Sequence, residues 1–355
     1  MFAHKPNFDQ AQEQINAFWH HQDTGRPYAG IVYSKPGAKP FPSKQHNTIE
    51  DYWLDLAYRA EATAHDMENS VFYADAMPVH MPNLGPGIFS AWAGCPYIFG
   101  QHTAWTEPCI TDWANENAIA DANHPLAKKL EDYTRILLEK AKGKFIVGLT
   151  DFHPGGDHLA ALRGSLELAM DILDNPNPIK EKNESSYKEY FAIFDFYTDW
   201  LKREGMPISS WIPLTAPLGK TMYIPSNDFS CMISTDMFEE FFLQGIIAEC
   251  KHFDYSIYHL DGPDAIQHLD ILLQIPELNA IQWVPTAGQG QMHRWVDLCK
   301  KILESGKSLY VDLHSKEDLD IAMANLPSKG LALNFGHVKD EETAKEIFKQ
   351  ISNWN

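Results

Sequence analysis

Eight short apolar runs alternate with longer amphipathic segments along this chain of 355 residues, and that alternation limits the folds open to it. No run is longer than eight residues, and each is nearly continuous in apolar character. Such runs are typical of parallel strands that are covered on both faces. The predicted strands span residues 28–34, 70–75, 144–151, 207–213, 254–261, 279–285, 308–313 and 331–335.

Segments with helical periodicity separate these runs. The predicted helices span residues 49–65, 125–141, 157–174, 186–203, 236–251, 263–273, 291–305, 315–325 and 340–353. A helix after each of eight strands predicts an α/β fold, a single (β/α)8 TIM barrel with an N-terminal helical extension, as one domain over residues 1–355. The runner-up is a doubly wound open sheet, but the GxGxxG and GxxxxGK[ST] motifs are both absent.

Charge and composition exclude several classes of function. Lys and Arg total 29 against 48 Asp and Glu, a formal net charge of −19. Such a chain repels polyphosphate and anionic lipid, so we expect neither nucleic acid nor a membrane as partner. We find no signal peptide and no apolar stretch of membrane-spanning length, and we expect a cytoplasmic protein. The five cysteines show no CxxC spacing, so each is expected to be a small buried residue.

Polar residues follow several predicted strands, and in a barrel the active site lies at those strand ends. Asp75 and Asp151 end the second and third strands and are the candidate catalytic residues, together with His337 after the last strand. An alternative for Asp75 is that it caps a turn and holds the following loop. Asp157 is expected to cap the helix that follows it.

The segment His259-Leu260-Asp261 is the candidate metal site. Side chains at i and i+2 of a strand point to the same face, so both can reach one point above the barrel axis. Imidazole nitrogen and carboxylate oxygen both suit zinc, and a catalytic zinc usually takes three protein ligands. His337 is the candidate third ligand. The alternative is a hydrogen-bonded His259–Asp261 pair, with His337 binding substrate directly.

Aromatic residues gather in the loops after the predicted strands, where they could line a pocket for an apolar or methylammonium-bearing substrate. Core packing is the ordinary role of such residues, and Trp283 and Tyr223 are the best pocket candidates. The remaining predicted substrate-binding residues lie at or near strand ends; they are Asn83, Asp228, Gln282 and Asn334.

Several segments resemble the uroporphyrinogen decarboxylase superfamily, which also contains zinc-dependent corrinoid:coenzyme M methyltransferases. Residues 72–75 resemble a strand end whose Asp contacts pyrrole nitrogens in the decarboxylases, and residues 227–242 are similar to their SPexFeeF helix and the segment before it. Residues 334–337 resemble their Asn-Leu-Gly-His, whose His meets substrate. Residues 259–262 are similar to the His-x-Cys-Gly of the methyltransferases, whose His and Cys ligate zinc.

Departures from the family patterns shape the functional hypotheses. The arginine-rich motif that holds porphyrinogen propionates is reduced to Arg26, so we expect no useful conversion of uroporphyrinogen. Asp261 and His337 stand where the methyltransferases have cysteines. The resemblance implies a zinc-dependent methyltransferase that acts on a small molecule with a corrinoid or small methyl donor, and a corrinoid protein as partner. The alternatives are a metal-free decarboxylase using Asp75 and His337, and a non-catalytic corrinoid- or tetrapyrrole-binding barrel. Pairing into a homodimer stays open.

Overall fold

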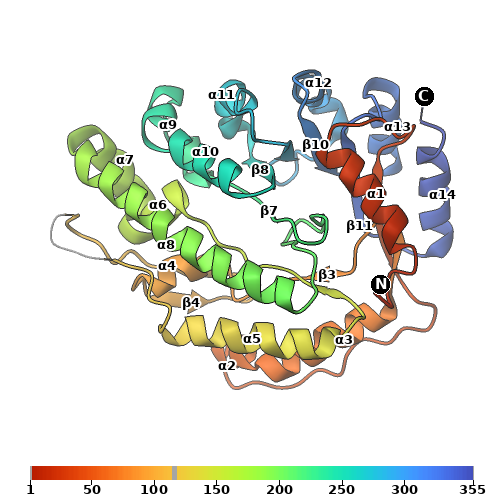
Figure 1. Cartoon of the computed structure of the whole chain (residues 1–355), viewed down its shortest axis with the longest axis horizontal. Helices are drawn as coiled ribbons and strands as arrows, with labels where there is room; N and C mark the ends of the chain where they lie inside the picture. The colour runs from red at the N-terminus through yellow and green to blue at the C-terminus, as the bar shows by residue number, and fades with distance from the viewer. Residues whose placement is uncertain (1, 114–117, 355) are drawn as a thin grey trace.

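A mostly parallel sheet of seven strands forms the centre of the molecule in the computed structural model, which describes residues 2–113 and 118–354 (Figure 1). Its order is β2-β1-β11-β10-β9-β8-β7, and only β2 runs antiparallel to its neighbour. The bounds are β1 (Tyr28–Ser34), β2 (Ser70–Ala74), β7 (Met222–Tyr223), β8 (Tyr255–Asp261), β9 (Ala280–Val284), β10 (Ser308–Asp312) and β11 (Leu331–His337). We call the edge where the parallel strands end the carboxyl edge, and the opposite one the amino edge.

Two smaller strand pairs accompany this sheet. The strands β3 (Val79–His80) and β6 (Ile146–Val147) pair in parallel, while β4 (Tyr97–Phe99) and β5 (Ala104–Thr106) form an antiparallel hairpin. Backbone bonds extend the β6 side, from Gly148 N to His80 O at 2.9 Å and from Leu149 N to Ser209 O at 2.7 Å. The α/β class is therefore confirmed. Within the described residues the strand ladder does not run full circle, and closure of the barrel stays a prediction.

The predicted strand at residues 207–213 is wrong, because no regular strand forms there. The apolar side chains Ile208 and Ile212 are buried, but the segment turns on itself instead of extending. Ser209 Oγ donates to Leu214 O at 2.6 Å, and Ser210 Oγ donates to Leu149 O at 2.9 Å. These side-chain bonds satisfy backbone groups that a strand ladder would otherwise pair.

Helices precede and separate the strands, and most predicted helices are present, several of them divided in two. The helices are α1 (Phe8–Trp19), α2 (Ile49–Leu54), α3 (Leu56–Asn69), α4 (Ile88–Trp92), α5 (Pro125–Ala141), α6 (Gly155–Arg163), α7 (Ser165–Asp174), α8 (Pro176–Arg203), α9 (Thr235–Phe241), α10 (Leu243–His252), α11 (Leu269–Leu273), α12 (Val296–Glu304), α13 (Lys316–Asn325) and α14 (Glu341–Ile351), with 3-10 turns η1 (Asp228–Met232), η2 (Pro263–His268) and η3 (Met292–Arg294).

Side-chain caps explain where several of these helices begin. Thr48 and Asp51 form a reciprocal capping box at α2, and the carboxylate of Asp340 accepts the Thr343 amide at 2.9 Å at α14. Between α6 and α7, Gly164 adopts a φ of 97°, a left-handed conformation that glycine enters without strain. That residue divides the single helix predicted over residues 157–174.

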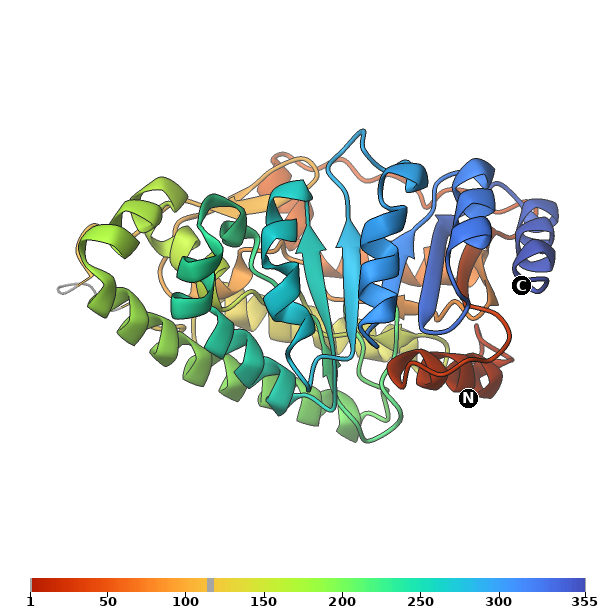
Figure 2. The ribbon, with the colours of Figure 1, turned by 90° about the horizontal axis from the view of Figure 1, so that it is seen from above.

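The first helix, α1, lies across the amino edge of the sheet (Figure 2). The Trp19 indole donates to Thr215 O at 3.0 Å, and Ser308 Oγ at the start of β10 donates to Phe18 O at 2.6 Å. The N-terminal helical extension predicted from the sequence is therefore present, and it covers the end of the sheet opposite the predicted catalytic mouth.

Both faces of the sheet are buried, and residues alternate between two hydrophobic clusters along β8, β9, β10 and β11. On β10, Leu309 and Val311 pack in one cluster with α12 and α13, while Tyr310 packs in the other. That second cluster also contains residues of α1, α3, α5 and α8. The near-continuous apolar character of the strands follows from this two-sided burial.

The cysteines follow the sequence expectation only in part. Cys95, Cys250 and Cys299 are buried, whereas Cys109 is half-buried and Cys231 is exposed. Among the described residues, no helix combines the length and the apolar character that crossing a membrane requires.

Candidate functional site

The carboxyl end of β8 presents His259 and Asp261, which alternate with the buried Leu260. His259 pairs in register with Gln282 of β9, and its Nδ1 lies 2.7 Å from Gln282 Oε1. The His259 ring and the Trp211 indole form a T-shaped contact, with ring centroids 4.9 Å apart and planes at 89°. The imidazole is therefore held on two sides before any ligand is present.

A third acidic residue, Asp228, joins this pair. Backbone contacts bring its segment alongside β8, since Ser226 bridges His259 in parallel and the His259 amide donates to Pro225 O at 2.9 Å. One ligand atom from each of Asp228, His259 and Asp261 lies within 4.8 Å of the other two. We call these three residues the triad.

The chemistry and the closeness of the triad's ligand atoms suit a divalent metal ion. One imidazole and two carboxylates are zinc ligands at bond lengths of about 2.0–2.2 Å, which places ligand atoms roughly 3.5 Å apart in a tetrahedron. The triad atoms lie no more than 4.8 Å apart, close enough for side-chain rotations to bring them to that spacing. Three protein ligands leave a fourth position for substrate or water, as in catalytic zinc sites.

Beside the triad, His153 is enclosed by carboxylates. Its Nε2 lies 2.7 Å from Asp151 Oδ1, and its Nδ1 lies 2.7 Å from Ser226 Oγ and 4.0 Å from Asp157 Oδ2. Burial alone would lower the pKa of His153, but the charges of Asp151, Asp157 and Asp228 raise it to about 10. The ring is therefore an imidazolium at neutral pH.

Asp157 does not cap its own helix as predicted. Pro154 occupies the position before α6, and the carboxylate of Asp157 instead accepts the Phe229 amide at 2.8 Å and the Ser226 hydroxyl at 3.2 Å. These bonds hold η1, the turn that begins with Asp228. The sequence signal was present in residues 151–157, whose two acids flank a histidine, but the partner segment 226–229 lies about 70 residues away along the chain.

Asp228 is exposed towards a cavity, yet the protein atoms around its carboxyl desolvate it and raise its pKa to about 6. The negative charge of Asp157 acts in the same direction, while His259 and His153 oppose it. A carboxyl with a raised pKa beside an imidazolium is the kind of perturbed pair that functional sites contain. The predicted role of Asp228 was substrate binding alone.

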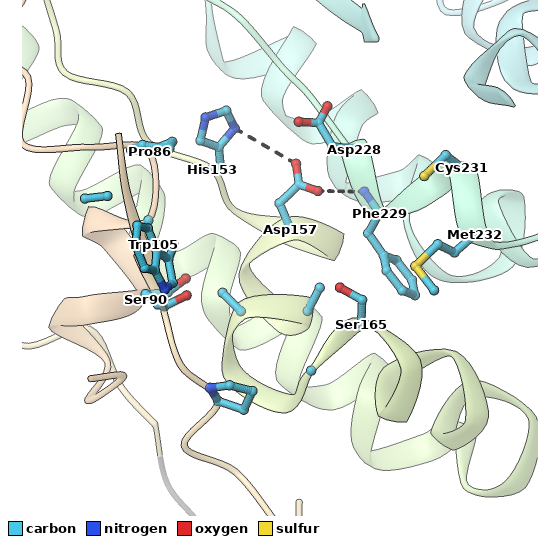
Figure 3. Close-up of a pocket in the computed structure, with 17 residues that line it drawn as sticks. Pro86, Ser90, Trp105, His153, Asp157, Ser165, Asp228, Phe229, Cys231 and Met232 are labelled. Atoms are coloured by element: carbon cyan, nitrogen blue, oxygen red, sulfur yellow. Dashed lines mark hydrogen bonds and ion pairs between the residues drawn. The ribbon is translucent and has the colours of Figure 1, made fainter. Parts of the chain in front are cut away.

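The cavity next to the triad has a volume of about 570 Å³ (Figure 3). His153, Asp157 and Asp228 lie together on one side of it, and Trp105 of the β4–β5 hairpin lies on the other. The rest of its lining is mostly small or apolar and consists of Pro86, Gly87, Ser90, Ala104, Thr106, Pro108, Ala160, Ala161, Gly164, Ser165, Phe229, Cys231 and Met232.

The expected position of Asp75 at the carboxyl edge of the sheet is wrong, because this residue lies at the amino edge, away from the triad. Because β2 runs antiparallel to β1, the end of β2 reaches the amino edge of the sheet. There the carboxylate of Asp75 accepts two bonds from the Arg26 guanidinium, at 2.5 and 2.9 Å, and one from the Ala29 amide at 2.9 Å. Arg26, considered from the sequence as a remnant of a propionate-binding motif, is engaged by this carboxylate.

His337 lies at the carboxyl edge as predicted, but not beside His259. It ends β11, three strands away from β8 in the sheet order, and its Nε2 lies 2.9 Å from Ser34 Oγ. Among the described residues it is absent from the group that could hold a metal, and Asp228 takes the third position instead.

The other predicted substrate-binding residues have structural partners. Asn334 Nδ2 donates to Asp312 Oδ1 at 2.6 Å, and Asn83 Oδ1 accepts the Gly85 amide at 2.7 Å in the loop that also bears Pro86. Gln282 contacts His259, as described above. Of this set, Asp228 belongs to the triad and Gln282 contacts it through His259, whereas Asn334 and Asn83 are not part of the triad.

Tyr223 and Trp283 are both buried in the core and do not line the cavity. The Tyr223 hydroxyl donates to Thr150 O at 2.6 Å and accepts the Phe152 amide at 2.7 Å, so it ties β7 to the segment after β6. Trp283 packs against Trp295 with ring centroids 4.9 Å apart, on the helix-covered face of the sheet. Its position next to Gln282 places it on the opposite face from His259.

Comparisons with known proteins identify the fold. The chain matches a solved structure described as a methyltransferase from Methanosarcina mazei, with a TM-score of 0.58 and 12% sequence identity over 96% of this chain and 98% of that one. No protein-family model matches the sequence. A search of curated proteins also finds no match. The fold is therefore that of this methyltransferase.

Proposed function

We propose that this chain is a metal-dependent methyltransferase of the uroporphyrinogen decarboxylase superfamily, folded as one barrel domain. The observation that carries the proposal is the convergence of Asp228, His259 and Asp261 beside the cavity. The likeness in fold to a methyltransferase supports the same reaction class. We further propose zinc as the metal and a corrinoid, carried by a partner protein, as the methyl donor or acceptor.

Each part of the site has a role in this proposal. When bound, zinc acts as a Lewis acid that favours the anionic, nucleophilic form of a thiol or alcohol ligand. Gln282 keeps the His259 ring oriented, and Asp157 holds the turn that carries Asp228. The imidazolium of His153 lies at the cavity wall and offsets part of the negative charge of the surrounding carboxylates.

The decarboxylase alternative is less well supported by the geometry. It requires Asp75 and His337 at one substrate, but Asp75 bonds Ala29 near the start of β1 and His337 bonds Ser34 at its end. Five residues of strand separate these contacts, about 16 Å at 3.3 Å per residue. A non-catalytic barrel that binds a corrinoid is tested by the experiment below.

Metal content is the first test. We expect about one zinc per chain in protein purified from zinc-replete medium, and a loss of affinity of more than ~100-fold in His259→Ala and Asp228→Asn, because each removes a direct ligand. Asp297→Asn, which changes an exposed acid on α12, is the matched control. Wild-type protein with well under one metal per chain would overturn the proposal.

Methyl transfer is the second test. Metal-loaded protein is incubated with methylcobalamin carrying a labelled methyl group and a panel of small thiols, and the labelled thioether is measured. We expect transfer by wild type and by Asp297→Asn, and none by His259→Ala. Metal binding without transfer to any thiol would favour the non-catalytic barrel.

A further inference from the structure

The cavity beside the triad carries an excess of negative charge. Among its lining residues are two carboxylates, Asp157 and Asp228, and no lysine or arginine. The positive charge on the wall belongs to His153, which is ion-paired to Asp151 at 2.7 Å and to Asp157 at 4.0 Å. A small anion entering the cavity therefore meets carboxylates without a free basic side chain to compensate them.

A bound divalent ion would not reverse this charge. Asp151, Asp157, Asp228 and Asp261 supply four negative charges around the site when ionised. A divalent ion and the His153 imidazolium together supply three positive charges. The site therefore favours a cation over an anion of the same size, both in the metal-free and in the metal-loaded protein.

The other walls of the cavity are apolar and include an aromatic face. Trp105 lies across from the acidic side, and 48% of its surface is exposed, a large fraction for a tryptophan. Phe229, Met232 and Pro108 add further apolar surface. Tryptophan is the side chain that binds organic cations best through its ring face. A quaternary ammonium or a sulfonium centre has no hydrogen-bond donor that an apolar wall would leave unpaired.

We propose that this cavity binds a small organic monocation that carries methyl groups on its charged nitrogen or sulfur. Asp157 and Asp228 attract the charge, and Trp105 contacts the methyl groups. The inference rests on the proposed function, with the cation as methyl donor and the reduced corrinoid of the partner protein as acceptor. The carbon–nitrogen or carbon–sulfur bond of the cation breaks, the methyl group passes to the corrinoid, and a neutral amine or thioether leaves. The volume of about 570 Å³ accommodates a molecule of this size together with water.

Three isosteric probes separate charge from shape. Choline, 3,3-dimethylbutanol and 3,3-dimethylbutyrate share a trimethylated head but differ in charge, and their binding is measured by isothermal titration calorimetry. We expect choline to bind at least tenfold more tightly than the neutral alcohol, and the carboxylate to bind most weakly. Equal binding of choline and the alcohol, or no binding of choline at millimolar concentration, would overturn the proposal.

Variants of the two cavity sides assign the contacts. We expect Trp105→Ala to weaken choline binding about two- to thirtyfold and Trp105→Phe to restore part of it, because a smaller aromatic face remains. Asp157→Asn should weaken choline binding but leave the alcohol unaffected. Phe196→Ala on α8, with 49% exposure, is the matched control for loss of an exposed aromatic ring. Unchanged choline affinity in both Trp105→Ala and Asp157→Asn would place the cation elsewhere and contradict the assignment.

The same titrations on metal-free and zinc-loaded protein separate this inference from the proposed function. Choline binding by a protein that takes up no metal would leave the cation site standing while the metal-dependent function fails. A protein that binds metal and transfers methyl groups, but binds choline and 3,3-dimethylbutanol equally, would support the metal-dependent function and contradict the cation site.

Discussion

His259 Nδ1 lies 2.7 Å from the side-chain oxygen of Gln282 on the neighbouring strand. Because that oxygen only accepts hydrogen bonds, Nδ1 must carry the proton and donate it. In that tautomer the lone pair is on Nε2, the nitrogen that remains for a metal or a substrate. Such a bond to the second nitrogen orients metal-binding histidines and raises their basicity.

Replacing Gln282 tests this orientation directly. We expect Gln282→Met to keep the volume of the buried side chain but to lower zinc affinity by about 10- to 100-fold, because His259 loses its acceptor. Zinc affinity is measured by competition with a chromogenic chelator. Gln274→Met, at the exposed residue that follows α11, controls for the substitution itself. Unaltered affinity in Gln282→Met would show that the ring is held without this bond.

The two strand-end histidines are expected to differ in their effect on metal binding. His337→Ala should keep the full zinc content, because His337 lies three strands from β8 and contacts Ser34. His259→Ala should lose most of its zinc under the same conditions. Elemental analysis of the two variants side by side is sufficient. Equal losses of zinc in the two variants would support His337 as a metal ligand, as the sequence predicted.

Local strand geometry explains what the sequence predicted well. His259 and Asp261 share a face because side chains alternate along β8, and that rule needs no knowledge of the rest of the fold. The third ligand position is different. Asp228 reaches the pair because Pro225 and Ser226 make backbone contacts with His259 of β8, a tertiary contact that has no periodic signal in the sequence.

Strand direction explains the misplaced Asp75. An apolar run of residues 70–75 has the same pattern whether it lies parallel or antiparallel to its neighbour, and β2 is antiparallel. Reversing one strand moves its end from the carboxyl edge to the amino edge. Trp283 was misassigned for a related reason, since one step along β9 changes the face of the sheet. An apolar run alone shows neither the direction of its strand nor the face of the sheet on which each of its side chains lies.

The buried hydroxyl of Tyr223 is expected to stabilise the fold through its two hydrogen bonds to the backbone. Tyr223→Phe removes the hydroxyl that accepts the Phe152 amide and donates to Thr150 O, leaving both backbone groups buried without that partner. We expect the free energy of unfolding to fall by about 1–3 kcal/mol. Chemical denaturation of wild type and variant measures it, and Tyr52→Phe, at a more exposed tyrosine, is the control. A change below 0.5 kcal/mol, roughly the scatter of surface substitutions, would contradict the assigned role.

Glu249 of α10 is fully buried, an uncommon location for a carboxyl. Its Oε2 accepts a long bond of 3.4 Å from the Tyr187 hydroxyl, and its Oε1 has no hydrogen-bond partner. Burial is the largest influence and raises the pKa of Glu249 from 4.5 to about 8, although the nearby hydroxyls of Tyr190 and Tyr187 and the charge of His153 act against it. The folded protein therefore holds a neutral carboxylic acid at this position at pH 7.

The pH dependence of stability should report this buried acid. Between pH 4.5 and about 8 the unfolded chain has lost the Glu249 proton while the folded chain keeps it, so this group makes the protein less stable as pH rises. Its contribution is at most about 1.4 kcal/mol per pH unit. Glu249→Gln removes it, so the variant should gain stability relative to wild type from pH 5 to pH 8. Urea denaturation at four pH values measures the difference in stability. Glu239→Gln, at an exposed residue of α9, is the control. Parallel pH profiles for wild type and Glu249→Gln would mean that Glu249 is ionised in the folded protein.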